Sequence, residues 1–147
     1  ANRRKGFLVA KKQLKVGVWA GDGPPPGYRW NVAILDLAFD EVMSFLSESQ
    51  YRHLAMQFKE LALETVPSHD ATASIDQIED YFELRDKGGI LGKINVRIFF
   101  GLTDDHTIVV LGGIKKEREG QTPSGTKVNM RRRLRKYLNG DYGRLNA

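Results

Sequence analysis

The side chains best suited to chemistry in this chain are basic, and they gather in its second half. Arg85 and Arg97 lie within two apolar segments, and Lys115, Lys116 and Arg118 follow a third. A guanidinium can bind two oxygens of one phosphate at once, and fixed cations stabilise the extra negative charge of a phosphoryl transition state. These five residues therefore predict a phosphate site, provided that the fold brings them onto one concave surface.

For Arg97, two roles without chemistry stay open on the sequence alone. A charged residue within a strand can face solvent on an uncovered side of the sheet, or it can pair with an acidic residue on the neighbouring strand. Glu83 in the preceding strand is the nearest candidate for such a pair. Arg97 is therefore either a phosphate ligand or a structural cation.

Other types of chemistry have little support in this sequence. The histidines His53, His69 and His106 are far apart and lack metal-ligand spacing, which favours exposed or capping roles over catalysis. Gly88-Gly89 and Gly112-Gly113 lack the spacing of a phosphate-binding loop, and zero cysteines exclude disulfides and thiolate catalysis. We therefore expect neither a metal site nor a cofactor.

Charge is unevenly distributed along the 147 residues, whose net charge is +5. Residues 36–86 contain three Lys or Arg and twelve Asp or Glu, whereas residues 115–136 contain nine Lys or Arg and two Glu. A basic segment of this density favours a polyanionic or acidic partner, although a solvated helix face has the same composition. Its arginines Arg131, Arg132 and Arg135 are candidate phosphate contacts.

Length and composition predict one main domain with a short extension at each end. Residues 1–27 are expected to form an N-terminal extension, able to add a hairpin, that ends in a Gly- and Pro-rich linker. Residues 28–140 are expected to form the domain, and residues 141–147 a tail. The chain has no long apolar run, so we expect no membrane span, and the missing cysteines suit a reducing cytoplasm.

The elements that must position the basic residues can be read from the hydrophobic pattern. A strand is predicted over residues 28–35, followed by a helix with Asp36 as its N-cap. A second helix is predicted from about Tyr51 to just before Pro67, and residues 67–79 as a polar loop. The two helices would form a hairpin that covers one face of a sheet.

From Tyr81 onward the apolar period changes from helical to alternating. Three strands, containing Phe82 and Leu84, then residues 94–100, then residues 107–114, are close in sequence and predict an antiparallel meander. A final helix follows, with Met130, Leu134, Tyr137 and Leu138 on its inner side and Arg132, Arg135 and Lys136 on its outer side.

The order of these elements, with the motifs WNVAILDLAFDEVMSFL, YFELR, VRIFFGL, IVVLGGIKKE, TP and RRRLRKYL, resembles the RelE/ParE toxin superfamily. The HigB-type and phage-derived branch is the most similar. The resemblance spans residues 30–138, and the ordered set is more specific than any single motif. It implies a RelE-like α+β fold, with an N-terminal strand and helical hairpin packed on an antiparallel sheet (a three-strand meander) and a C-terminal helix.

Members of that superfamily with known activity are mostly ribosome-dependent mRNA interferases. The resemblance therefore implies a metal-independent endoribonuclease in which an RNA 2′-hydroxyl attacks the adjacent phosphate. Its partners would be mRNA on the ribosome and a cognate antitoxin protein in the cytoplasm. By the same resemblance, Arg97 stabilises the phosphate, and Lys116 or Arg118 stabilises the charge of the leaving group or transition state. The resemblance implies RNA contacts by Arg85 and Lys115, and Arg131, Arg132 and Arg135 of the Arg-rich final helix are further predicted RNA-binding residues.

The residues for proton transfer depart from the family pattern. Relatives of the RelE type have lysines in the second strand and a tyrosine after the basic run, whereas this chain has Glu83 and Arg85 in that strand and no tyrosine within residues 121–126. Either Glu83, Lys87 or His106 substitutes, or the protein is a slow or inactive nuclease. Two alternative functions follow: a non-catalytic ParE-like gyrase poison, and an inactive RelE-fold binding protein.

Overall fold

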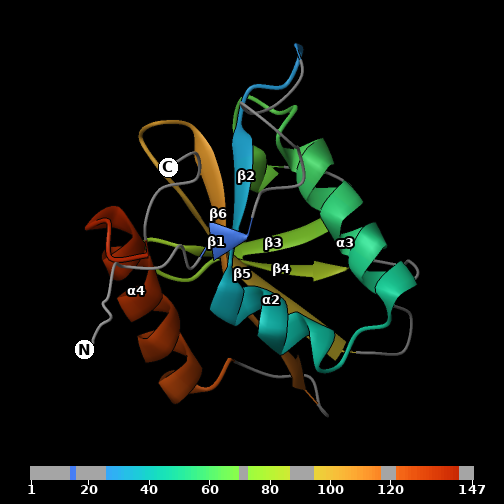
Figure 1. The fold of residues 1–147 in the computed structure, drawn as a ribbon, viewed down its shortest axis with the longest axis vertical. Helices are drawn as coiled ribbons and strands as arrows, with labels where there is room; N and C mark the ends of the chain where they lie inside the picture. Colours follow the sequence, from blue (N-terminus) through green and yellow to red (C-terminus); the bar gives the residue numbers. More distant parts are fainter. Residues whose placement is uncertain (1–13, 16–25, 70–72, 87–94, 117–121, 143–147) are drawn as a thin grey trace, which may run out of the picture.

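The structure, a computed structural model, describes residues 14–15, 26–69, 73–86, 95–116 and 122–142 (Figure 1). Its strands are β1 (Leu14–Lys15), β2 (Asn31–Leu35), β3 (Ala73–Gln77), β4 (Phe82–Asp86), β5 (Asn95–Leu102) and β6 (Thr107–Lys116). Its helices are α2 (Asp36–Met43), α3 (Glu48–Leu61) and α4 (Ser124–Leu138), with a 3₁₀ turn, η1 (Pro67–His69). The α+β class predicted from the sequence is confirmed.

The six described strands form one mixed sheet in the order β1-β2-β6-β5-β4-β3. Strands β3 to β6 are an antiparallel meander, β2 runs parallel to β6, and β1 pairs antiparallel with β2. The predicted sheet was therefore wrong in two respects: the meander has four strands rather than three, and the sheet is not purely antiparallel. The parallel pair is possible because α2, α3 and the other strands of the meander form a long crossover between β2 and β6.

The extra strand is β3, which lies in the segment predicted as a loop over residues 67–79. Its central residue Ile75 lies opposite Leu84 of β4 and packs against the core, while its neighbours are polar. One apolar residue gives no clear alternation, so local sequence carries little strand signal here. Pairing with β4 supplies the backbone hydrogen bonds that make β3 a strand.

Both helix starts differ from the prediction for local reasons. Asp36 is the first residue of α2 rather than its N-cap, which is Leu35. The second helix begins at Glu48, before the predicted Tyr51, because Ser47 and Gln50 form a capping box. Ser47 Oγ accepts a hydrogen bond from the Gln50 amide at 3.2 Å, and Gln50 Oε1 accepts one from the Ser47 amide at 2.8 Å.

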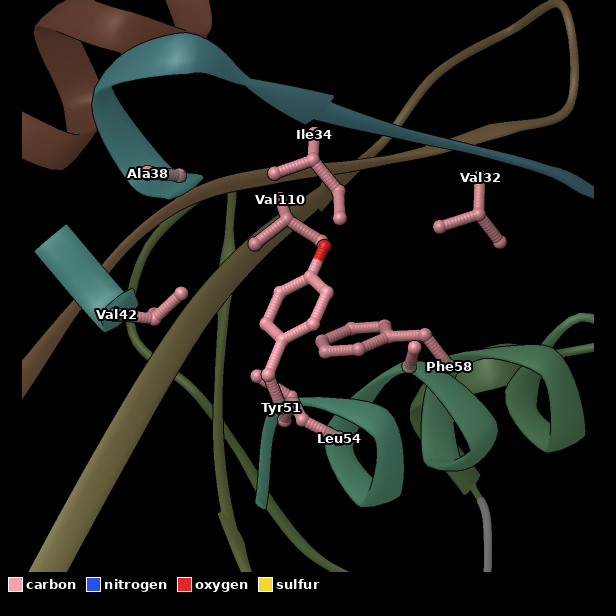
Figure 2. A pocket seen from close by; sticks show the side chains of 9 residues that line it. Val32, Ile34, Ala38, Val42, Tyr51, Leu54, Phe58 and Val110 are labelled. Atoms are coloured by element: carbon pink, nitrogen blue, oxygen red, sulfur yellow. The ribbon is translucent and has the colours of Figure 1, made fainter. Parts of the chain in front are cut away.

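Helices α2 and α3 cover one face of the sheet, as the predicted helical hairpin requires. Side chains from β2, β6 and both helices meet around a small apolar cavity (Figure 2). The Tyr51 hydroxyl is the only polar side-chain group in its lining, and burial raises the pKa of Tyr51 above its usual value. The lining residues are Val32, Ile34, Ala38, Val42, Tyr51, Leu54, Ala55, Phe58 and Val110.

Helix α4 covers the opposite face of the sheet (Figure 1). Its buried side chains Met130 and Leu134 lie over two glycines of the strands, Gly112 and Gly101. A Cβ atom at Gly112 would lie 2.6 Å from Met130 Cε, and one at Gly101 would lie 2.8 Å from Leu134 Cδ1. The missing side chains therefore let the helix pack close to the sheet.

Candidate nucleic-acid interface

Arg97, predicted to contact a phosphate, is a buried cation in β5. Its side chain is 0% exposed, its Nη1 lies 3.8 Å from Glu83 Oε1, and the same nitrogen donates a hydrogen bond to Thr122 Oγ1 at 3.1 Å. The Thr122 hydroxyl donates in turn to Glu83 Oε1. Of the roles left open by the sequence, the structure contains the pairing with Glu83. The predicted exposure of Arg97 on a concave surface is not found.

Arg85 extends this network from the buried side chains toward the surface. Its Nε and Nη2 atoms lie 3.1 and 3.0 Å from Glu83 Oε2, and about a third of its side chain is exposed (32%). Arg85 also lies directly opposite Arg97 in the β4–β5 register. Because two like charges would repel at such close range, the Glu83 carboxylate between them is what allows both cations to occupy this face.

The lysines at the end of β6 do not all join Arg85 and Arg97. Lys115 is exposed and pairs with Val96, whereas the next pair along the ladder is Arg97 with Ile114. Since neighbouring residues of a strand point to opposite faces, Lys115 lies on the other face of the sheet from Arg97. The backbone of Lys116 pairs with Asn95. The Lys116 side chain and all of Arg118 lie outside the part that the structure describes.

The basic residues of α4 divide into paired and outward-facing groups. Arg131 donates to Glu79 Oε1 at 2.6 Å in the β3–β4 turn, so its charge is partly compensated. Arg132, Arg135 and Lys136 are exposed, as predicted, and Arg132 contacts only Asn129 among the described side chains, at 3.3 Å. Helix α4 contains no acidic residue, so these cations form a single-sign outer face.

Leu138 differs from the prediction that placed it on the inner side of this helix. Its side chain is 58% exposed, whereas Tyr137 is half-buried and packs against the core. Leu138 is the last residue of the helix. The outer face of α4 thus combines cations with an exposed leucine near its C-terminal end.

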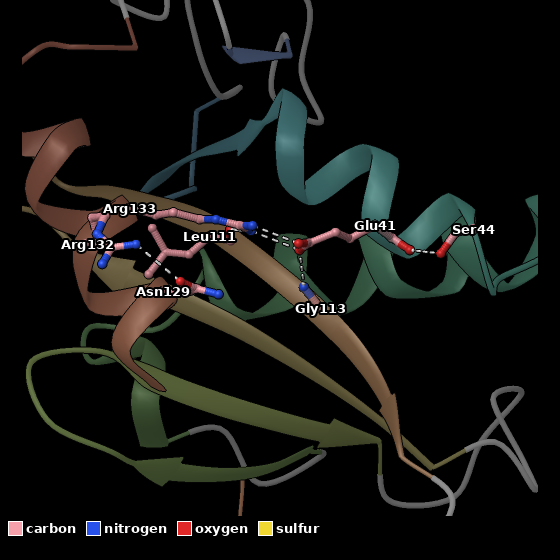
Figure 3. A network of polar contacts seen from close by, with 7 residues as sticks. All are labelled: Glu41, Ser44, Leu111, Gly113, Asn129, Arg132 and Arg133. Atoms are coloured by element: carbon pink, nitrogen blue, oxygen red, sulfur yellow. Dashed lines mark hydrogen bonds and ion pairs between the residues drawn. The ribbon is translucent and has the colours of Figure 1, made fainter. Parts of the chain in front are cut away.

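A clasp formed by Arg133 and Glu41 holds this helix against the rest of the fold (Figure 3). Arg133 reaches across β6 and places Nη1 and Nη2 at 2.9 and 2.7 Å from the two Glu41 oxygens. Arg133 Nη1 also donates to the Leu111 carbonyl at 2.9 Å, and Glu41 Oε1 accepts from the Gly113 amide at 3.2 Å. Val110 is the last residue of β6 that pairs with β2. Beyond it, the clasp supplies hydrogen-bond partners for the Leu111 carbonyl and the Gly113 amide.

The three histidines are dispersed in the structure as they are in the sequence. His53 is half-buried in α3, His69 is exposed in η1, and His106 is exposed in the β5–β6 turn with a φ of 61°. His106 stacks on Trp30 with ring centroids 4.7 Å apart. It immediately precedes β6, whereas Lys115 lies near the other end of that strand, so His106 is not placed to transfer a proton at the basic end.

Tyr81 is a titratable residue near α4 that the sequence did not single out for chemistry. It is fully buried, and its hydroxyl donates to the Lys127 carbonyl at 3.1 Å. Burial, followed by the nearby Glu79 carboxylate, raises the pKa of Tyr81 to about 12. Tyr81 therefore stays protonated at neutral pH and ties the start of β4 to α4 rather than transferring protons.

Glu83 is the residue whose importance sequence reasoning underestimated. The sequence offered it as a pairing partner for Arg97 or as a substitute base, yet it is 1% exposed and joins Arg97, Thr122 and Arg85 at once. A fully buried carboxylate with these partners is not placed to abstract a proton from a bound substrate. The available signal was its spacing: Glu83 and Arg85 are two residues apart and therefore share one face of β4.

Comparison with known proteins adds no family assignment. No protein-family model matches this chain, and no curated protein sequence matches it. Within the described ranges, His, Asp and Glu side chains do not gather in threes as a metal site requires. None of the described helices is long and apolar enough to cross a membrane.

Proposed function

We propose that this chain is the toxin component of a toxin–antitoxin pair, a RelE-like endoribonuclease that cuts mRNA on the ribosome. The observation that carries the proposal is the outer face of α4, where Arg132, Arg135 and Lys136 are exposed in a helix without acidic residues. Exposed cations of one sign attract a phosphate backbone without requiring base contacts. The order of strands and helices in the α+β fold is a second, coarser support.

In the proposed reaction, the 2′-hydroxyl of one nucleotide attacks the adjacent phosphorus, and the bond from phosphorus to the 5′-oxygen breaks. The products are a 2′,3′-cyclic phosphate and a free 5′-hydroxyl, so one proton leaves the nucleophile and one joins the leaving oxygen. Arg85 stabilises the charge of the phosphorane in place of the buried Arg97. Lys116 and Arg118 keep the leaving-group and transition-state roles that the family resemblance implies.

The proposed partners follow from the distribution of charge. The basic outer face of α4 contacts mRNA bound to the ribosome, and a cognate antitoxin in the cytoplasm covers the same cations to prevent that contact. An acidic antitoxin segment is favoured, because like charges would oppose binding at α4. The strongly acidic stretch of residues 36–86 is not proposed to contact the RNA or the acidic antitoxin segment, because like charges would repel.

The proposal is tested by adding the purified protein to a reconstituted translation reaction and mapping mRNA ends by primer extension. New 5′ ends that require translating ribosomes support it, and Arg85→Ala should weaken them about 10²-fold or more. Intact mRNA across several coding sequences, with a protein shown to be folded, contradicts the nuclease assignment.

One observation favours a second candidate, a non-catalytic ParE-like toxin that poisons DNA gyrase. Arg97 is buried and Lys115 lies on the other face of the sheet, so these two members of the predicted phosphate-binding group do not share one concave surface. Inhibition of gyrase supercoiling at stoichiometric protein, with mRNA left intact, would decide for this function. Expression without growth arrest or either effect would instead favour an inactive binding protein of the same fold.

A further inference from the structure

The Glu83 carboxylate divides its two oxygens between the inside of the fold and the surface. Oε1 accepts the hydrogen bond from Thr122 and lies 3.8 Å from Arg97 Nη1, and both of those side chains are buried. Oε2 faces Arg85, which is the only partly exposed member of the group. Buried partners thus hold Oε1 in place, and Oε2 is free to hold the Arg85 guanidinium.

Arg85 uses only part of its guanidinium on Glu83. Nε and Nη2 bind one carboxylate oxygen, while Nη1 makes no hydrogen bond to any side chain or carbonyl that the structure describes. About a third of the side chain remains open to solvent. A guanidinium held along one edge presents its remaining N–H groups in a fixed direction, whereas a free arginine must lose rotamer entropy when it binds a ligand.

We infer that Glu83 is a positioning residue, which fixes the Arg85 guanidinium so that its open edge binds one backbone phosphate of RNA. This inference rests on the proposed function, since RNA is the substrate proposed there. Glu83 touches no substrate itself, because it is 1% exposed, and it acts through Arg85. Glu83 also accepts a hydrogen bond from Thr122, which lies two residues before α4. This bond fixes the position of the phosphate site relative to the basic helix.

The surroundings of Arg85 limit the site to a small anion contact. In the β3–β4 register Ser74 lies opposite Arg85 and Asp76 lies opposite Glu83, so both share this face of the sheet. Ser74 is short and can add a hydroxyl donor. Asp76 is exposed and opposes further negative charge, which confines the favourable position for a phosphate to the Arg85 side.

The exchange rate of the Arg85 side chain and the RNA affinity distinguish a positioning role of Glu83 from a purely structural one. In the full-length protein, the ¹⁵N NMR signal of Arg85 Nε–H should exchange slowly with water, because its hydrogen bond is anchored to a buried carboxylate. Glu83→Gln should speed that exchange and weaken binding of a short single-stranded RNA about tenfold. Glu48→Gln is the matched control, because Glu48 pairs with Arg52 on an exposed helix surface and its loss should change neither signal nor affinity.

Two further variants keep the test decisive if Glu83→Gln does not fold. Arg85→Gln leaves the inner partners of Glu83 in place and should reproduce the loss of RNA affinity. Arg85→Lys should lose most of it too, because a lysine cannot be held along one edge by a carboxylate. Unchanged RNA affinity in a folded Arg85→Gln protein would overturn the inference.

The same measurements distinguish this failure from failure of the proposed function. If the wild-type protein cuts translated mRNA and Arg85→Gln cuts it equally well, the Glu83–Arg85 inference is wrong while the function stands. If RNA binding depends on Arg85 and Glu83 but the wild-type protein never cuts mRNA, the positioned phosphate site stands and the nuclease function does not.

Discussion

Arg133 on α4 binds both carboxylate oxygens of Glu41 on α2, at 2.9 and 2.7 Å. The two residues are far apart in sequence, and the pair joins helices that pack on opposite faces of the sheet. Its partial burial distinguishes it from the exposed pair between Glu48 and Arg52, whose side chains are 76% and 71% exposed.

Glu41→Gln should lower the free energy of unfolding by about 1–3 kcal/mol, because it weakens the hold on Arg133 and the contact with the Gly113 amide. Urea denaturation followed by circular dichroism measures the change. Glu48→Gln is the control and should cost about 0.5 kcal/mol or less. Equal effects of the two substitutions would show that the clasp contributes no more than a surface ion pair.

Gly112→Ala should destabilise the protein by about 1–3 kcal/mol, because the new methyl group would lie 2.6 Å from Met130 Cε and 2.7 Å from Glu41 Oε1. The ends of the Met130, Arg133 and Glu41 side chains must shift to admit it, which disturbs the clasp. Gly125→Ala, in the first turn of the same helix, meets nothing within 4 Å and should be neutral or slightly stabilising. Thermal unfolding of both variants tests the pair, and a neutral Gly112→Ala would show that these side-chain ends move aside without loss of stability.

Replacing Arg132 and Arg135 together with alanine should weaken RNA binding while leaving stability unchanged, since both side chains are exposed. The slope of log affinity against log salt should become shallower by about 1.4 for single-stranded RNA, at about 0.7 for each phosphate contact. Fluorescence anisotropy over a salt series measures it. Arg52→Ala together with Lys59→Ala on α3 removes the same charge, and an equal effect there would mean that only net charge matters.

Asp76→Asn should tighten RNA binding by a small factor, about two- to fivefold, because it removes a negative charge from the face that carries Arg85. The gain should disappear at high salt, where exposed charges are screened. Glu60→Gln, on the α3 side of the molecule, is the charge-matched control. Tighter binding by both variants to the same extent would argue against a local site near Arg85.

The protein should lose stability between about pH 10 and about pH 12. Burial raises the pKa of Tyr81 to about 12 from its ordinary value of 10.0, so the folded state holds this proton where the unfolded state releases it. The contribution is complete below pH 10 and is lost as the pH rises through the folded pKa. Urea denaturation from pH 9 to pH 11.5 should show a shallower decline in Tyr81→Phe, and parallel declines would contradict the linkage.

Periodicity in the sequence was sufficient to predict the architecture where apolar residues are dense. Strand β5, with residues Val96 to Phe100 buried, and helix α4, with Met130 and Leu134 inside, both follow from their patterns. The pattern failed for β3, because Ile75 is the only one of its described side chains packed against the core and its pairing with β4 cannot be read from local sequence. It also could not show that β2 lies beside β6, because strand order is a matter of tertiary packing.

The sequence predicted which basic residues belong to the candidate site, but not how they are arranged on the sheet. The sequence identified Arg85, Arg97 and Lys115 as a group, yet it did not determine which of them would be buried. Arg97 is buried, and its charge is compensated by Glu83 and by Thr122, which comes from a segment beyond β6. Lys115 lies on the other face because the β5–β6 register pairs it with Val96, and a shift of one residue would have reversed that outcome.

The parallel pairing of β2 with β6 affects how this protein can be synthesised. Residues 31–34 pair with residues 107–110, so the centre of the sheet cannot form until residues 107–110 have been synthesised. Non-local pairings of this kind slow folding and leave apolar strands unpaired for longer during translation. A nascent chain stalled before β6 has emerged should therefore be sensitive to protease and free of activity. For a protein proposed to attack the ribosome, such a delay would protect the ribosome that is still making it.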